Sequence, residues 1–193
     1  MHYDPQKKEI FLDRSLNTLD EFVLKFITIL ARYVPYTIIS GYVSIILGRA
    51  RATEDIDLLI PKITFDLFKP LYEDLQQQGF WCLNAEDVQE VFSYFRDGYS
   101  VRFALRDTTI PNFEVKFPRT LGEKESFQDT IKIHLSQNDI VLCSLESHVA
   151  FKKYFLQSEK DIEDAAYVEE LFKNQLDEHK INKYRQLIET NGK

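Results

Sequence analysis

Two aspartates, Asp55 and Asp57, lie two residues apart in a segment that is typical of a β-strand. Residues i and i+2 of a strand share a face, so both carboxylates point one way while Ile56 and Leu58 point the other. Two like charges about 6 to 7 Å apart repel each other unless they are solvated or a cation lies between them. Hard oxygen ligands suit Mg²⁺, which commonly takes one or two protein carboxylates, water and substrate phosphates. The pair therefore predicts either a solvated strand end or a magnesium site.

A glycine turn precedes this strand. Gly41 allows the backbone to approach a phosphate group and Ser40 offers a hydroxyl donor, although either residue can serve only to shape a strand-to-helix turn. Arg51 and Thr53, in the loop that leads to the strand, are candidate donors to an anionic group. The alternative interpretation leaves the loop arginines in solvent, paired with Glu54.

A third carboxylate is expected from a β-hairpin. The segments 99–106 and 112–117 alternate with a period of two across a bend, which is typical of paired antiparallel strands. Glu114 lies on the polar face of the second segment, which could lie beside the strand of the two aspartates and bring a third carboxylate to them. An equally good interpretation pairs Glu114 with Lys116. Asp107, in the bend, is the next candidate.

The second informative stretch begins near the C-terminal third of the chain. Ser158 and Asp161 have the spacing of a capping box that opens a helix. Lys153, on the apolar helix before it, is a candidate phosphate donor, with Lys152 one register away as its substitute. A surface lysine whose stem lies along the helix is nearly as good an interpretation of Lys153.

These stretches resemble the nucleotidyltransferase superfamily related to DNA polymerase beta. Ser40-Gly41 followed by the run from Gly48 to Asp57 is most similar to the small prokaryotic branch of abortive-infection toxins and minimal nucleotidyltransferases. The Lys-Asp-Ile-Glu-Asp run at 160–164 resembles the C-terminal signature of that branch, in which a helix lysine and a nearby aspartate approach the nucleotide. One position differs, because bulky Tyr42 follows the glycine here.

The resemblance implies an α+β fold: a nucleotidyltransferase-type mixed β-sheet flanked by helices, with a C-terminal helical part. We expect a core over residues 1–143 and a helical region over 144–193, packed on the core as a single compact unit. Two Mg²⁺ ions are expected on Asp55, Asp57 and Glu114. The residues implied to bind an NTP are Ser40, Gly41, Arg51, Thr53 and Lys153.

The activity implied is Mg²⁺-dependent transfer of NMP from an NTP to a hydroxyl acceptor on tRNA or on a protein, as a toxin-antitoxin component. The alternative is a catalytically silent nucleotide-binding or antitoxin-like interaction module, such as the partner of a HEPN-type ribonuclease. Tyr42 and the competing pairing of Glu114 with Lys116 favour the silent module. The intact Asp-Ile-Asp strand and the 160–164 run favour the enzyme.

Composition narrows the class of protein. The 193 residues fit one domain, 44% of them are hydrophobic, and the net charge of −7 gives no broad basic surface for nucleic acid. Cys82 and Cys143 are expected to be reduced thiols of the core, and His134 and His148 have no partner at ligand or triad spacing. No run approaches the roughly 18 apolar residues of a membrane span, and the N-terminus lacks an apolar signal core, so we expect a cytoplasmic protein.

Periodicity and turn residues predict the remaining elements. The expected elements are a helix from Thr18 to about Tyr33 opened by a capping box at Thr18 and Glu21, a strand over 36–40, a helix after Gly41, a helix over 65–78, a helix over 85–96 capped by Asn84, and strands over 130–134 and 139–142.

Overall fold

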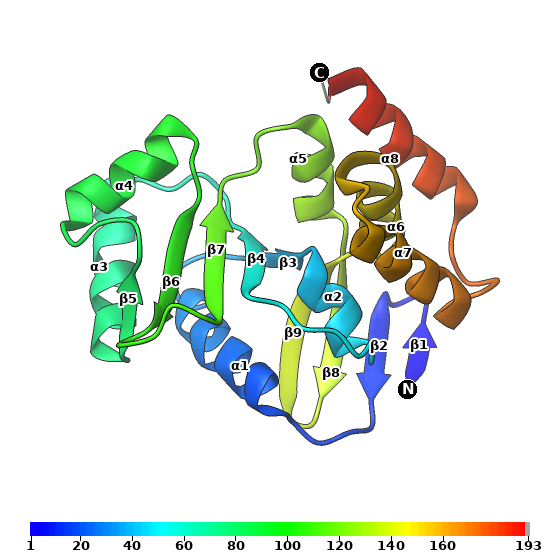
Figure 1. Ribbon diagram of the computed structural model, residues 1–193, viewed down its shortest axis with the longest axis horizontal. Coiled ribbons are helices and arrows are strands. Elements are labelled where there is room, and N and C mark those ends of the chain that lie inside the picture. The colour runs from blue at the N-terminus through cyan, green and yellow to red at the C-terminus, as the bar shows by residue number, and fades with distance from the viewer. Residues whose placement is uncertain (192–193) are drawn as a thin grey trace.

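The computed structural model describes residues 1–191 and contains a nine-stranded mixed sheet in the order β1-β2-β8-β9-β3-β4-β7-β6-β5 (Figure 1). The strands are β1 (His2–Asp4), β2 (Glu9–Leu12), β3 (Thr37–Ile39), β4 (Asp55–Leu59), β5 (Phe80–Cys82), β6 (Val101–Leu105), β7 (Asn112–Lys116), β8 (Thr130–Leu135) and β9 (Asn138–Cys143). The expected mixed sheet flanked by helices is confirmed.

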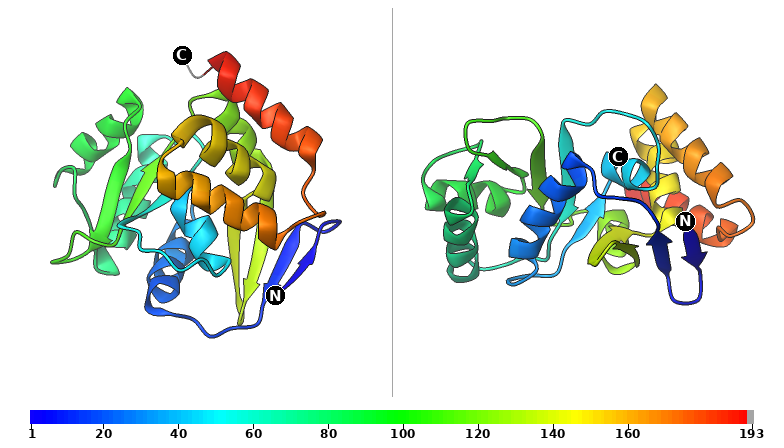
Figure 2. Two further views of the ribbon diagram at one scale, coloured as in Figure 1. Left: turned by 45° about the vertical axis from the view of Figure 1, so that its right-hand side comes forward. Right: turned by 90° about the horizontal axis from the view of Figure 1, so that it is seen from below.

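Helices gather at both ends of this sheet. They are α1 (Thr18–Leu30), α2 (Gly41–Ile46), α3 (Phe65–Gln77), α4 (Val88–Asp97), α5 (Leu121–Gln128), α6 (Leu145–Phe151), the π-helix η1 (Lys152–Leu156), α7 (Glu159–Leu171) and α8 (Glu178–Asn191). Helices α3 and α4 pack on each other beside β5 and β6, whereas α5 to α8 form a second group at the other end, as the turned views in Figure 2 show. No helix in the described part of the chain is both long and apolar enough to cross a membrane.

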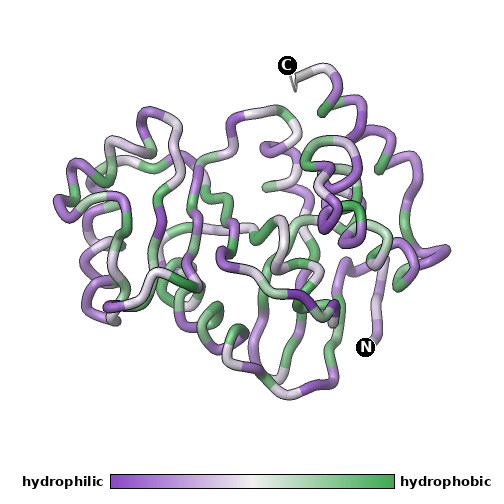
Figure 3. The backbone as a smooth tube through the Cα atoms, in the orientation of Figure 1, coloured by the Kyte–Doolittle hydropathy of each residue, from purple (hydrophilic) through white to green (hydrophobic). Residues whose placement is uncertain are grey.

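The central strands alternate between core and polar face. In β4, Ile56 and Leu58 are fully buried, and Asp55 and Asp57, which alternate with them, face the other way. Strand β4 pairs antiparallel with β3 and parallel with β7. Figure 3 shows green hydrophobic segments along these inner strands, in contrast to the largely hydrophilic outer helix α8. The polar face of β4 is therefore held by a rigid sheet rather than by a loop.

Aromatic rings fill the core behind this polar face. The Phe113 ring of β7 stacks on Phe26 and Phe22 of α1, with ring centroids 3.9 and 4.6 Å apart. Phe80 of β5 meets the Phe26 ring edge-on at 5.1 Å. Because Phe113 immediately precedes Glu114, packing of one side chain fixes the direction of the next.

Several expected boundaries are wrong, each for a local reason. Helix α1 is capped by a box between Asn17 and Asp20, one residue earlier than expected, because Asn17 has the extended backbone that accepts from the third residue of the helix. Helix α4 begins at Val88 after Asp87, which caps it with two backbone bonds. Asn84 does not cap a helix, because its amide is engaged by the backbone of β6 and its neighbour Ser100.

Other elements are not anticipated by the sequence pattern at all. Strands β1, β2 and β5 are three or four residues long, which is too short for a period of two to stand out. Helix α5 has a capping box between Thr120 and Glu123 but no strong apolar stripe. The capping box at Ser158 and Asp161 that opens α7 is confirmed.

Truncation of the Phe113 ring should destabilise the fold. We expect Phe113→Ala to lower the free energy of unfolding by about 3 to 5 kcal/mol, because a fully buried ring is replaced by a cavity. Urea denaturation measures this, with Ile110→Ala, at an exposed position, as a control that should change stability by less than about 0.5 kcal/mol. A loss of similar size in both variants would contradict the packing described.

Candidate active site

Three carboxylates share the polar face of two adjacent strands. Asp57 of β4 lies directly opposite Glu114 of the parallel strand β7, and Asp55 lies opposite Asn112. Directly opposed residues of paired strands point to the same face, so the register brings together Asp55, Asp57 and Glu114. Within the described residues, no three acidic, histidine or cysteine side chains are already arranged as a metal-binding group. The face carries three carboxylates, but they are not gathered around one point.

Glu114 is drawn toward the neighbouring strand β6. Its Oε2 accepts from the Nε and Nη2 atoms of Arg102 at 3.0 and 2.7 Å. Lys116 pairs with Glu123 of α5 at 2.9 Å. The alternative pairing of Glu114 with Lys116 is therefore wrong, because each group has an oppositely charged partner on another element.

Asp57 has an unusual environment for a carboxylate. Burial raises the pKa of Asp57 to about 6, and the negative charges of Asp55 and Glu114 add to this increase. The positive charge of Lys116 and a hydrogen bond from Ser40 act in the opposite direction. The three carboxylates thus form a face with excess negative charge, which a divalent cation would neutralise.

The turn before α2 is shaped around an arginine. Ser40 has φ of 63° and ψ of −139°, a conformation that non-glycine residues rarely adopt and that is often found at functional sites. A Cβ atom on Gly41 would lie 3.2 Å from the Nη2 atom of Arg51, so the absence of a side chain lets this guanidinium lie over the turn. Tyr42 is fully buried and donates to Asp20 at 2.8 Å. Its bulk therefore lies in the core.

A buried ion cluster connects this turn to the C-terminal helices. The carboxylate of Asp164, on α7, is fully buried and accepts from Arg49 and Arg51, and from Lys152 at 3.0 Å. Lys152 also pairs with Asp161. Burial alone would raise the pKa of Asp164, but Lys152 and the two arginines hold this pKa below its usual range. The alternative pairing of the loop arginines with Glu54 is wrong, since acids of α7 pair with them.

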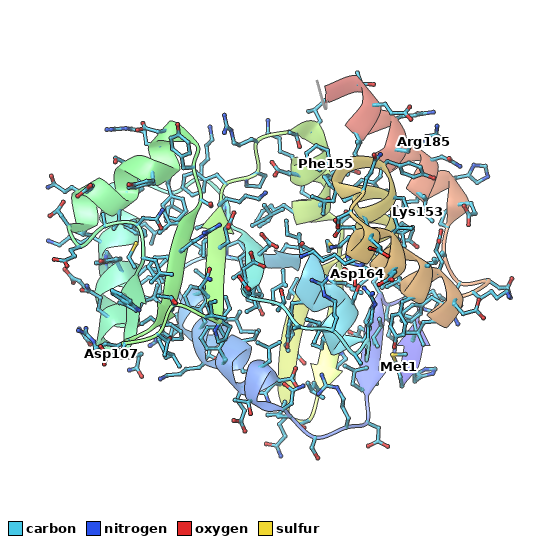
Figure 4. The ribbon with its side chains drawn as sticks, viewed as in Figure 1. Met1, Asp107, Lys153, Phe155, Asp164 and Arg185 are labelled. Atoms are coloured by element: carbon cyan, nitrogen blue, oxygen red, sulfur yellow. The ribbon has the colours of Figure 1, made fainter. Side chains whose placement is uncertain are left out.

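The two neighbouring lysines have different positions. Lys152 is 2% exposed and lines a cavity beside Asp57, whereas Lys153 pairs with Glu169 at 2.9 Å and is labelled on the C-terminal helices in Figure 4. Residues 152–156 form a π-helix, whose wider turn changes the side-chain directions relative to an α-helix. A sequence pattern based on 3.6 residues per turn therefore does not predict which of the two lysines faces the cavity.

The remaining candidates have local roles. The hydroxyl of Thr53 donates to the backbone oxygen of Asp55 at 2.9 Å and so shapes the start of β4. Asp107 lies in the connection between β6 and β7, at the far end of the hairpin from the C-terminal helices (Figure 4). The structure thus groups the predicted residues of the turn and strand, and it places Lys153 and Asp107 apart from them.

A cavity of about 100 Å³ lies between the carboxylate face and the C-terminal helices. Its wall is polar near Asp57 and Ser40 and apolar near Phe155, which is 52% exposed and labelled in Figure 4. The full lining is Ile39, Ser40, Asp57, Leu59, Lys116, Glu123, Ser126, Cys143, Ser147, His148, Phe151, Lys152, Phe155 and Leu156.

His134 and His148, for which the sequence pattern shows no partner, each share a hydrogen bond with another side chain in the folded chain. His148, buried on the cavity wall, shares a hydrogen bond with Ser44 at 2.9 Å. Burial and the nearby charge of Lys152 lower the pKa of His148 to about 3, so its ring is neutral at physiological pH. His134 meets Asp139 at 2.7 Å. The partner of His148 is more than a hundred positions away in the chain, so spacing could not reveal it.

Comparison with known proteins identifies the class of fold. No protein-family description matches the chain, and no curated protein matches it. The solution structure of the antibiotic-resistance factor ANT(2'')-Ia aligns with a TM-score of 0.56 at 15% identity, over 88% of this chain and 90% of that one. The complex of ANT(2'')-Ia with adenylyl-2''-tobramycin gives 0.52 at 14% identity, over 90% and 98%.

A fungal protein gives a similar result. The antigenic nucleotidyltransferase-like protein from Paracoccidioides brasiliensis aligns with a TM-score of 0.55 at 16% identity, over 92% of this chain and 91% of that one. Identities this low show the fold alone. The chain therefore has a nucleotidyltransferase-like fold, as its sequence motifs predict.

Neutralising Asp57 should stabilise the protein at neutral pH. The folded-state pKa of about 6 lies above the unfolded value of about 3.8, so ionisation of Asp57 lowers stability as the pH rises between these values. We expect Asp57→Asn to be more stable than the parent by up to about 3 kcal/mol near pH 7.5, with the difference shrinking toward zero near pH 4. Urea denaturation at both pH values measures this.

The Asp55→Asn variant tests how much of the raised pKa of Asp57 comes from the neighbouring charge. Removing this neighbouring charge should lower the pKa of Asp57 without abolishing the contribution of burial, which NMR titration of the Asp57 carboxyl carbon can follow. An Asp57→Asn variant less stable than the parent near pH 7.5 would show that the carboxylate serves the fold instead.

Proposed function

We propose that this protein is a Mg²⁺-dependent nucleotidyltransferase that transfers NMP from an NTP to a hydroxyl acceptor. The observation that carries the proposal is the register of β4 and β7, which sets three carboxylates on one face beside the glycine turn. A nucleotidyltransferase-like fold supports it, and one similar structure holds an adenylylated compound. In the reaction, the acceptor hydroxyl releases its proton to solvent and its oxygen forms a bond to the α-phosphorus while the bond to pyrophosphate breaks.

The donor set fits magnesium. Asp55, Asp57 and Glu114 offer hard carboxylate oxygens, and burial together with mutual repulsion leaves Asp57 in need of a compensating charge. When bound, the ions would stabilise the charge that develops on the attacking and leaving oxygens. The protein's own contribution is to hold the three carboxylates on a rigid sheet.

Fixed cations suit the triphosphate. Arg51 lies over the Gly41 turn and Lys152 lines the cavity, and both are held in place by the buried carboxylate of Asp164. Donors that are already oriented stabilise transition-state charge without reorganisation. Lys152 takes the place of Lys153 in this proposal, because Lys152 lines the cavity and Lys153 does not. The apolar part of the cavity would receive the nucleoside.

The acceptor in this proposal is a hydroxyl of tRNA or of a protein, and the cellular role is that of a toxin-antitoxin component. Support for both comes from the sequence resemblance of the 48–57 and 160–164 runs. The protein is incubated with Mg²⁺, each labelled NTP and either total RNA or cell lysate. Label that enters RNA or label that enters a protein distinguishes the two acceptors.

A second candidate is a catalytically silent module, antitoxin-like or partnered with a HEPN-type ribonuclease. The ion pair between Arg102 and Glu114 favours it, because this pair occupies the third carboxylate. Activity of the purified protein decides between the two functions.

Substitutions of the carboxylates should separate binding from chemistry. Glu114→Gln should leave nucleotide affinity close to that of the parent and slow transfer by orders of magnitude, because its charge matters mainly in the transition state. Asp57→Asn should weaken Mg²⁺-dependent nucleotide binding and abolish transfer. Calorimetry with ATP, CTP, GTP and UTP, with and without Mg²⁺, and single-turnover assays measure both effects. Transfer at the parent's rate in both variants would remove these carboxylates from the reaction, and absence of transfer by the parent itself would favour the silent module.

The adjacent lysines offer a matched pair of variants. Lys152→Gln should weaken nucleotide binding by about 1.5 to 3 kcal/mol, whereas Lys153→Gln should leave it nearly unchanged, because only Lys152 lines the cavity. Calorimetry measures the affinities, and thermal melting identifies any loss of folded protein caused by opening the ion cluster. Lys152→Arg, which keeps the charge, should recover part of the affinity. The opposite ranking of the two lysines would return Lys153 to the site.

A further inference from the structure

Arg102 occupies the carboxylate that the metal centre needs. It lies directly opposite Glu114 in the β6–β7 ladder, and two of its N–H groups donate to the same oxygen, Oε2, at 3.0 and 2.7 Å. A carboxylate oxygen has two lone pairs. Both lone pairs of Oε2 are therefore committed to the guanidinium, and this oxygen cannot bind a metal ion at the same time.

The guanidinium also responds to the other two carboxylates. The hydrogen bond and the charge of Glu114 raise the pKa of Arg102, and the charges of Asp55 and Asp57 raise it further. Arg102 thus partly neutralises the whole carboxylate face. The three carboxylates share a face without forming a metal-binding group in the described residues, and one of them, Glu114, is bonded to Arg102.

Only the side chain of Arg102 is free to leave. Its backbone N–H donates to Asn84 Oδ1 at 2.7 Å. The Nδ2 atom of Asn84 in turn donates to the carbonyl oxygen of Ser100 at 3.3 Å. The side chain, by contrast, is 52% exposed, whereas that of Glu114 is 20% exposed. Release of the ion pair would therefore move the guanidinium into solvent while the strand stays in place.

We propose that Arg102 is a positioning residue that holds Glu114 away from Asp55 and Asp57, so that the metal centre is completed only when this ion pair opens. The inference rests on the proposed function, because it assumes that Glu114 is a metal ligand. It assigns a resting state to the substrate-free protein, in which an arginine competes with a divalent cation for one carboxylate.

Mn²⁺ binding, followed by electron paramagnetic resonance, tests this competition without any substrate. Arg102→Gln should bind Mn²⁺ about three- to tenfold more tightly than the parent, because a half-exposed ion pair is lost as a competitor. Arg106→Gln removes the same charge from an exposed position in the β6–β7 connection and should leave the affinity nearly unchanged. Arg102→Lys, which keeps the charge but not the paired donors, should give an intermediate affinity.

The Glu114→Gln background distinguishes the ion pair from a general effect of charge. There, adding Arg102→Gln should tighten Mn²⁺ binding much less, because only the weaker interaction of Arg102 with Asp55 and Asp57 is then removed. An equal gain in both backgrounds, an equal gain from Arg106→Gln, or no gain from Arg102→Gln would overturn the proposal while the metal site stands. If neither the parent nor Arg102→Gln binds Mn²⁺, the metal site itself is wrong, and the proposed function fails with it.

Discussion

Repulsion among three carboxylates on one sheet face is the constraint on which the rest of the site depends. Asp55, Asp57 and Glu114 are set on this face by the register of β4 and β7, and the core behind β7 holds them there. Burial of Asp57 makes the repulsion costly. The ionised form of Asp57 therefore lowers the stability of the folded state, and such perturbed carboxylates are common in functional sites.

The cations around this face come from distant parts of the chain. Arg102 of β6 pairs with Glu114, while Arg51 and Lys152 are joined by Asp164 of α7. A buried carboxylate with three cationic partners orients them at little further loss of side-chain freedom. The C-terminal helices therefore belong to the site, since α7 provides the residue that holds the loop beside the glycine turn.

Those parts of this arrangement that depend on neighbouring residues in the chain can be predicted from the sequence. The polar face of β4 and the β6–β7 hairpin follow from a period of two, and the capping box at Ser158 follows from local hydrogen bonding. The pairing of Glu114 with Arg102, and of His148 with Ser44, depends on register and packing between distant segments. The π-helix hides the difference between Lys152 and Lys153, because its geometry is invisible to α-helical periodicity.

The central claim is that one face of β4 and β7 binds the cations that accompany a nucleotide. Anomalous diffraction from crystals grown with Mn²⁺ and a non-hydrolysable NTP analogue tests it most directly. The account predicts manganese peaks between Asp57, Asp55 and Glu114, with the triphosphate between this face and the Gly41 turn. Nucleotide bound elsewhere, or at this turn with no manganese on the three carboxylates, would contradict it.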